Sequence, residues 1–340
     1  MTRVRYGEVP LAEADGTLLA HSIRAGATSF KKGRRLGSHD LERLAEAGVA
    51  RVAVVRLDDT DVHEDEAAAR VARALRAQGL GAAEPFTGRV NLFAAKPGLL
   101  TVERDLIDRI NRVHPAITVA TLAPFSRVEA GVMVATIKII PFAAPLEAIE
   151  AIERLTAEAP GPAIAAHPFH ALRVALIQTR SSATTEKTLD KTERITEARL
   201  AALGGGLAWR ARCPHDAEAL AATIREARTK GCDLILVNGA SAITDLRDVI
   251  PVAIERAGGR VLHFGMPVDP GNLMFLGDLR GRPVLGLPGS SRSPALSGAD
   301  WVLERLICGV PVGPAEITAM GVGGLLKEIP TRPRPRLQRG

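Results

Sequence analysis

Between Leu172 and Gly309, a repeated alternation of short apolar runs and amphipathic segments is what most constrains how this chain can fold. It predicts strands at 174–178, 234–237, 261–264 and 284–287, and helices at 189–203, 217–229, 249–257 and 295–308. Strands separated by helices are expected to run mostly parallel, with helices on both faces. The sequence therefore predicts an α/β fold, a three-layer and mostly parallel sheet whose ligands bind at the carboxyl ends of the strands.

We expect four parts, with bounds at 1–59, 60–165, 170–315 and 316–340. In the first part we expect a small β-rich module with a helix capped by Ser38 and a strand at 52–55. In the second part we expect an α+β domain with helices at 67–78, 103–112 and 145–158 and a strand at 131–142. A linker that carries His167 and His170 is expected from residue 159. The third is the α/β domain, and the fourth, rich in proline and arginine, predicts a tail or linker.

Composition limits the kinds of partner. With 46% hydrophobic and 24% charged residues, the chain has ample material for a core. The net charge of +6 comes from scattered arginines, which favours a solvated surface over nucleic-acid binding. Three cysteines far apart in the sequence indicate neither a zinc site nor disulfides, and no apolar run approaches the roughly 20 residues of a membrane span. We expect a soluble cytoplasmic protein without a nucleic-acid or membrane partner.

Three segments rich in small and polar residues follow predicted strands, at 179–187, 238–248 and 287–293. Small residues let the backbone approach a ligand, and hydroxyl and arginine side chains donate to phosphate oxygens. Because all three segments are expected at one edge of the sheet, they predict a phosphate or pterin site. The predicted contacts are Thr179, Ser181, Ser182, Asn238, Gly239, Ser241, Pro288, Gly289, Ser290, Ser291, Arg292 and Ser293.

The order of several motifs resembles a known family. The matching stretches are 233–241, Asp248 followed by Gly258-Gly259, 269–277 and 287–293. In this order they resemble the molybdopterin-binding domain shared by the molybdopterin molybdotransferases and their adenylyltransferase relatives. Segments 14–20 and 30–55 resemble the N-terminal part of the same family, so the resemblance covers about half to two thirds of the chain.

The resemblance implies molybdopterin, or its nucleotide-activated form, as the ligand. It adds Pro270 and Gly271 to the predicted contacts, and it implies Asp248 as a Mg²⁺ or nucleotide-phosphate ligand with a catalytic role. Asp245 is the alternative carboxylate for that role, and the alternative for Asp248 is a carboxylate that stabilises the start of a helix. The resemblance also implies a homodimer.

Two departures from the family pattern bear on activity. The first loop reads Thr179-Arg-Ser-Ser-Ala where the family carries T-G-D-E-L, and Asp269 and Asn272 replace two lysines suited to an oxyanion such as molybdate. Three hypotheses follow: a molybdopterin-binding member of the family, a Mg²⁺-dependent molybdotransferase with altered loops, and a non-catalytic carrier or scaffold. The carrier would present the cofactor to a nucleotidyltransferase partner.

Overall fold

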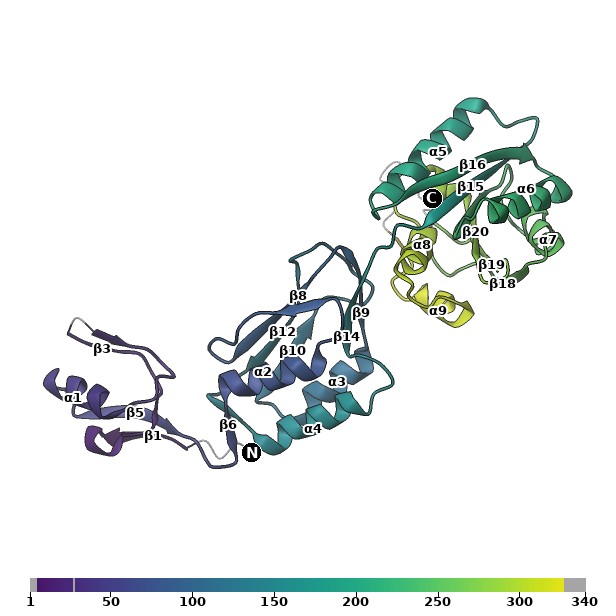
Figure 1. The fold of residues 1–340 in the computed structure, drawn as a ribbon. Coiled ribbons are helices and arrows are strands. Elements are labelled where there is room, and N and C mark those ends of the chain that lie inside the picture. Colours follow the sequence, from purple (N-terminus) through teal and green to yellow (C-terminus); the bar gives the residue numbers. More distant parts are fainter. Residues whose placement is uncertain (1–4, 27, 327–340) are drawn as a thin grey trace, which may run out of the picture. The chain divides into compact units, whose positions relative to one another are not determined.

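The computed structural model describes residues 5–26 and 28–326, and the chain divides into two compact units, Met1–Pro168 and Phe169–Gly340 (Figure 1). Each unit is described by itself. The proline- and arginine-rich end of the predicted tail, from residue 327, lies outside the described residues. Within the described ranges, no helix is both long and apolar enough to cross a membrane.

The first part of the N-terminal unit is a small β-rich module, as predicted. Its elements are β1 (Arg5–Pro10), η1 (Leu11–Glu13), β2 (Leu18–Leu19), β3 (Ile23–Ala25), β4 (Thr28–Phe30), α1 (Ser38–Glu46) and β5 (Arg51–Arg56). β5 lies between β1 and β2 and is antiparallel to both. The helix cap differs from the prediction, because Gly37 is the N-cap and Ser38 is the first helical residue. The Gly37 N–H donates to Asp40 Oδ2 at 3.4 Å, which fixes the helix start one residue earlier.

The rest of this unit packs three helices against small antiparallel sheets. Its elements are β6 (Asp61–His63), α2 (Glu64–Leu75), β7 (Leu80–Ala82), β8 (Arg89–Ala94), β9 (Gly98–Val102), α3 (Arg104–Val113), β10 (Ile117–Thr121), β11 (Arg127–Val128), β12 (Met133–Ile139), β13 (Ala143–Pro145), α4 (Leu146–Ala157) and β14 (Ile164–Pro168). The predicted linker from 159 is wrong for its second half, because Ile164–Pro168 pairs antiparallel with β9. Ile164, Ala165 and Ala166 are buried, and this apolar contact holds the segment in the sheet.

The C-terminal unit holds the predicted α/β fold. Its elements are β15 (Arg173–Arg180), α5 (Glu186–Ala201), β16 (Gly206–Pro214), α6 (Ala217–Thr229), β17 (Leu234–Asn238), α7 (Val249–Arg256), β18 (Arg260–Phe264), β19 (Phe275–Asp278), β20 (Pro283–Leu287), η2 (Gly289–Arg292), α8 (Gly298–Cys308), α9 (Pro314–Thr318) and η3 (Ala319–Gly321). The strand order is β16-β15-β17-β20-β19-β18. β16, β15, β17 and β20 are parallel, and β19 is antiparallel to both of its neighbours. The predicted three-layer, mostly parallel sheet is confirmed.

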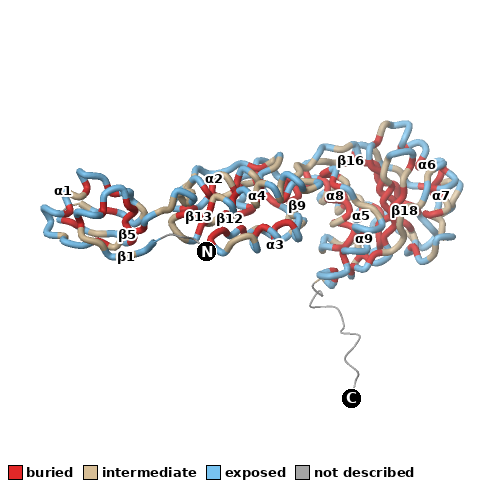
Figure 2. The backbone as a smooth tube through the Cα atoms, turned by 90° about the horizontal axis from the view of Figure 1, so that it is seen from below, coloured by how far each residue is buried: buried red, intermediate tan, exposed pale blue. Residues whose placement is uncertain are grey.

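The two faces of this sheet use different apolar residues. One face presents mainly leucines, among them Leu176 and Leu236, and packs against α5 and α8. The other face presents smaller or β-branched residues, among them Ile177 and Val237, and packs against α6 and α7. The central strands are therefore buried on both sides, which explains their unbroken apolar runs. Figure 2 shows buried residues gathered in the interior of this unit.

Part of the segment expected to be a tail is folded. α9 and η3 follow α8, and Ile317 and Met320 are buried in the leucine-rich core beside α8. Residues 316–326 thus pack onto the unit instead of forming a linker, because Ile317 and Met320 complete one face of the core and the Leu326 N–H donates to the Asp269 carbonyl at 2.9 Å.

Candidate functional site

The strand-end loops leave the sheet along one edge. The four parallel strands end at this edge, and the register places Gln178 of β15 beside Asn238 of β17, which in turn lies beside Leu287 of β20. The loops that follow these strands therefore begin at the same level of the sheet. The 265–274 segment between β18 and β19 leaves from the same edge, because β18 runs parallel to β20.

On the α6 side of the edge, one histidine joins the first and second loops. Thr179 is fully buried, and its Oγ1 lies 2.7 Å from His215 Nδ1. His215 Nε2 lies 2.8 Å from Ser241 Oγ. The Ala240 N–H also donates to Thr179 Oγ1, at 2.8 Å. These contacts hold the second loop against the end of β15.

On the α8 side, the third loop holds the second loop from the opposite direction. Buried Asn238 donates through Nδ2 to Ser291 Oγ at 3.1 Å. Its Oδ1 accepts from Arg292 Nε at 2.9 Å, and Arg292 Nη2 donates to the Gly239 carbonyl at 2.6 Å. The second loop is thus bound from both sides of the sheet, and the predicted contacts Asn238, Gly239, Ser291 and Arg292 form one network.

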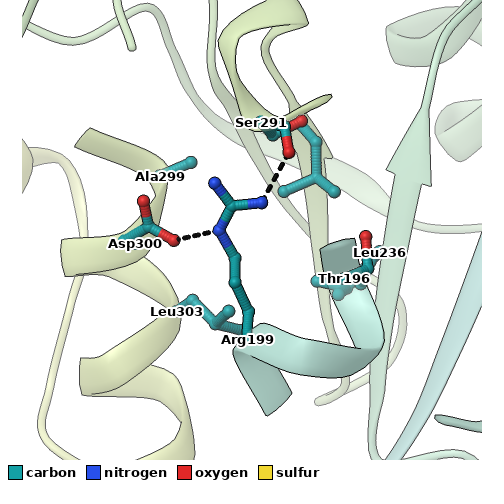
Figure 3. A pocket seen from close by; sticks show the side chains of 8 residues that line it. Thr196, Arg199, Leu236, Ser291, Ala299, Asp300 and Leu303 are labelled. Atoms are coloured by element: carbon teal, nitrogen blue, oxygen red, sulfur yellow. Dashed lines mark hydrogen bonds and ion pairs between the residues drawn. The ribbon is translucent and has the colours of Figure 1, made fainter. Parts of the chain in front are cut away.

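Arg199 of α5 supports the third loop from beneath, as Figure 3 shows. Its Nε donates to Asp300 Oδ1 at 2.7 Å, and its Nη1 donates to the Ser291 carbonyl at 2.5 Å. Nη2 donates to the carbonyls of Ser293 and Ala295. A small cavity beside these groups has room for about one water molecule. This guanidinium therefore gathers the carbonyl groups of the third loop into a fixed turn.

Close packing and an unpartnered hydroxyl mark the edge as a place that could receive a ligand. A Cβ on Gly239 would lie 2.8 Å from the Ser241 carbonyl oxygen and 2.9 Å from Ile250 Cδ1, so only glycine fits there. The Ser290 Oγ atom is buried and has no hydrogen-bond partner among the described residues. A buried hydroxyl without a partner is costly, and an oxyanion ligand would satisfy it.

The remaining predicted contacts are arranged more loosely. Ser181 and Ser182 are exposed in the first loop, where the Ser181 N–H donates to Thr184 Oγ1 at 3.0 Å. Pro270 contacts the start of α8, because its carbonyl accepts from the Gly298 N–H at 2.8 Å. A Cβ on Gly271 would lie 2.6 Å from the same nitrogen. Buried Pro288 and exposed Gly289 begin the third loop.

The two predicted catalytic carboxylates are both engaged within the second loop. Asp245 Oδ1 accepts from Arg247 Nε at 2.8 Å and from the Arg247 N–H at 2.7 Å. Asp248 is the N-cap residue of α7, and its Oδ2 accepts from the N–H groups of Thr244 and Asp245 at 2.5 and 3.0 Å. These N–H groups lower the pKa of Asp248. The side chains thus close the loop upon itself.

A preformed metal site is not built from these residues. The described part of the chain contains no group of three or more His, Cys, Asp or Glu side chains that could hold a metal ion. Asp245 is paired with Arg247, and one oxygen of Asp248 is taken by loop amides. The donor set therefore does not fit a Mg²⁺ ion held by the protein alone.

The ion pair in the second loop gives a pH prediction. The side chain and the N–H of Arg247 lower the pKa of Asp245 from 3.8 to about 2. A carboxyl with a depressed folded pKa contributes stability above its unfolded pKa and loses it as the pH falls through the folded value. We therefore expect the stability that the Asp245–Arg247 contact contributes to fall as the pH drops below about 4, and the contact itself to be half open near pH 2. Carboxyl ¹³C NMR should place the Asp245 midpoint near 2 in the native chain, and nearer 3.8 in Arg247→Gln. A native midpoint near 3.8 would contradict this ion pair.

Sequence reasoning missed His215 and the pair of Arg199 with Asp300. His215 follows β16, a strand that was not predicted because Arg210 and Arg212 interrupt its apolar pattern. Both arginines form ion pairs with acids of α5, so this edge strand alternates charged and apolar residues. The alternation itself was the available indication of a strand.

Comparison with known protein families agrees with the fold. Residues 175–307 match the family described as a probable molybdopterin binding domain. This match confirms the resemblance predicted from the motifs of the α/β domain. Residues 8–56 match a family described as a domain of unknown function (DUF8806). No curated protein sequence matches the chain.

Several solved structures are similar at low identity. The molybdopterin biosynthesis MoeA protein from Pyrococcus horikosii is 15% identical with a TM-score of 0.31, and the match covers 90% of this chain and 75% of that chain. Molybdenum cofactor biosynthesis protein B is 20% identical with a TM-score of 0.30, over 41% and 90% of the two chains. The tungsten cofactor synthesizing protein MoaB from Pyrococcus furiosus is 16% identical with a TM-score of 0.27, over 39% and 89%.

Proposed function

We propose that the C-terminal unit, which carries a domain of the molybdopterin-binding family, binds molybdopterin or its nucleotide-activated form in molybdenum cofactor biosynthesis. The observation that carries the proposal is the joining of the three loops at one sheet edge. Thr179, Asn238 and Ser291, one from each loop, are buried there and hydrogen-bonded into the networks that hold the second loop.

The donors at this edge suit a phosphorylated pterin. Ser241 presents an exposed hydroxyl in the second loop, and Ser290 presents a hydroxyl without a partner in the third. Hydroxyl groups donate to phosphate oxygens, and neutral donors and acceptors suit the polar edge of a pterin ring. The side chains that link the loops would hold these donors in place before the ligand arrives.

The charges favour binding of the pterin over capture of free molybdate. Arg292 points two of its nitrogens at Asn238 and Gly239, and Arg247 pairs with Asp245. Arg180 lies 3.7 Å from Glu186. The arginines of the three loops are therefore committed largely to the protein, and Asp269 stands where the family carries a lysine. This supports the cofactor-binding or carrier roles over metal insertion.

Binding can be measured by titrating the full chain with molybdopterin under anaerobic conditions and following pterin fluorescence. We expect saturable binding with one site per chain. Ser241→Glu adds a negative charge at the edge and should weaken binding at least about tenfold, because it repels the ligand phosphate. Ser29→Glu makes the same change at an exposed position of the N-terminal unit and should leave binding unchanged. No binding by the native chain would overturn the proposal.

The Mg²⁺-dependent transferase is the second candidate, and Asp248 tests it. Asp248 Oδ1 makes no hydrogen bond within the described ranges, so that oxygen could still face a ligand-bound ion. Asp248→Asn keeps an acceptor oxygen for the loop amides, so we expect it to bind molybdopterin like the native chain. If the chain inserts molybdate with Mg²⁺ and ATP, Asp248→Asn should abolish turnover. Equal turnover by both proteins would make Asp248 structural.

Two further proposals concern assembly. A homodimer and a nucleotidyltransferase partner are proposed from the resemblance alone. Light scattering on the purified full chain should give twice the monomer mass if the dimer forms. Transfer of bound molybdopterin to an added molybdopterin nucleotidyltransferase, faster than release into buffer, would support the carrier role.

A further inference from the structure

His215 sits on a rigid turn between β16 and α6. The backbone N–H of His215 donates to the Arg180 carbonyl at 2.9 Å, which ties the turn to the end of β15. The next residue, Asp216, caps α6 by accepting from the N–H groups of Glu218 and Ala219, each at 3.0 Å. The backbone of His215 is therefore held on both sides, and the residue lies half-buried between the first and second loops.

The hydrogen-bond partners of Thr179 decide which nitrogen of His215 carries the proton. Thr179 Oγ1 already accepts from the Ala240 N–H, and Thr179 is fully buried. If His215 Nδ1 carried the proton, Thr179 would accept twice and its own hydroxyl hydrogen would be buried without an acceptor, which is costly. The consistent arrangement has the Thr179 hydroxyl donating to Nδ1 of a neutral imidazole.

The position of the proton on His215 also determines the direction of the hydrogen bond between His215 and Ser241. A neutral imidazole protonated on Nε2 donates through that nitrogen to Ser241 Oγ, 2.8 Å away. Ser241 Oγ then acts as the acceptor, and its own hydroxyl hydrogen remains available. The side chain is exposed at the ligand edge, so this hydrogen can be donated outward.

We propose that His215 is a positioning residue that, through the chain Ala240–Thr179–His215–Ser241, orients the Ser241 hydroxyl to donate to a phosphate group of the ligand. This inference rests on the proposed function, because it needs a phosphorylated ligand at the same edge. Its chemistry is specific, since the imidazole accepts from one hydroxyl and donates to another.

Two substitutions at His215 test the Thr179 half and the Ser241 half of this hydrogen-bond chain separately. His215→Asn retains an amide oxygen near the position of Nδ1, so Thr179 keeps its acceptor, but the shorter side chain cannot reach Ser241. His215→Gln extends an amide nitrogen toward the position of Nε2 and keeps the donor to Ser241. Ser241→Ala and the double substitution His215→Asn with Ser241→Ala complete the set. The affinities for molybdopterin and for its dephosphorylated form are measured with each full-length protein.

We expect His215→Asn, Ser241→Ala and the double substitution each to weaken molybdopterin binding about tenfold, since the first removes the orientation of the Ser241 donor and the other two remove the donor itself. Binding of the dephosphorylated form should be unchanged, and His215→Gln should keep most of the native affinity. A loss of about a hundredfold in the double substitution would show independent effects and overturn the inference. So would an unchanged His215→Asn, or an equal loss for both pterins. If the native chain binds neither pterin, the proposed function itself fails.

Discussion

Replacing Arg199 with methionine is expected to lower the free energy of unfolding of the C-terminal unit by about 3 kcal/mol. The Arg199 and Asp300 side chains are only 15% and 12% exposed, so the substitution leaves a nearly buried carboxylate without its partner. It also removes the donor to the Ser291 and Ser293 carbonyls, so the third loop should lose its fixed turn. Molybdopterin binding should weaken with it.

Chemical denaturation followed by tryptophan fluorescence measures the free energy of unfolding of the C-terminal unit. Both tryptophans of the chain, Trp209 and Trp301, lie in the C-terminal unit. Arg194→Met is the matched control, because Arg194 lies on the exposed surface of the same helix. The control should change stability by less than about 0.5 kcal/mol. Equal stability of the two variants would mean that Arg199 does not hold the third loop.

Replacing Arg292 with methionine is expected to weaken molybdopterin binding at least about tenfold while costing only about 1–2 kcal/mol of stability. The side chain makes two of the hydrogen bonds that link the third loop to the second, to Asn238 Oδ1 and to the Gly239 carbonyl. Without it, Gly239 and the residues after it are no longer held toward the third loop. Ligand binding must then supply the free energy that orders them.

Arg247→Met is the control for this substitution. Arg247 belongs to the second loop, but its side chain is 90% exposed and pairs with Asp245 of the same loop. Removing it subtracts the same charge from the same edge without separating the loops. Isothermal titration should therefore show near-native affinity for Arg247→Met. An affinity loss equal to that of Arg292→Met would mean that both losses come from the removal of a positive charge.

The sequence predicted the central fold well because the inner strands are buried on both faces. The runs at 174–178 and 234–237 have no polar residue until Gln178 and Asn238, where the strands reach the sheet edge. Buried strands of this kind read as continuous apolar runs. β16 and β19 were missed for different reasons, since β16 alternates arginines with apolar residues and β19 is only four residues long.

The candidate site residues could be proposed one by one from the sequence, but the network that joins them could not. Thr179, Asn238 and Ser291 stand out because polar residues follow apolar strands. Their partners do not stand out, because Arg199 reaches across 92 positions to Ser291 and His215 bridges loops on either side of it in the sequence. Side-chain contacts of this range depend on how helices pack on the sheet, and the local pattern does not contain that information.

Hydrogen–deuterium exchange of the full chain, with and without molybdopterin, tests most directly whether the three loops form one binding site. The account predicts that the ligand slows exchange in 179–187, 238–248 and 287–293 together, and leaves exchange in the N-terminal unit unchanged. Protection confined to one of these segments, or found only outside them, would contradict it.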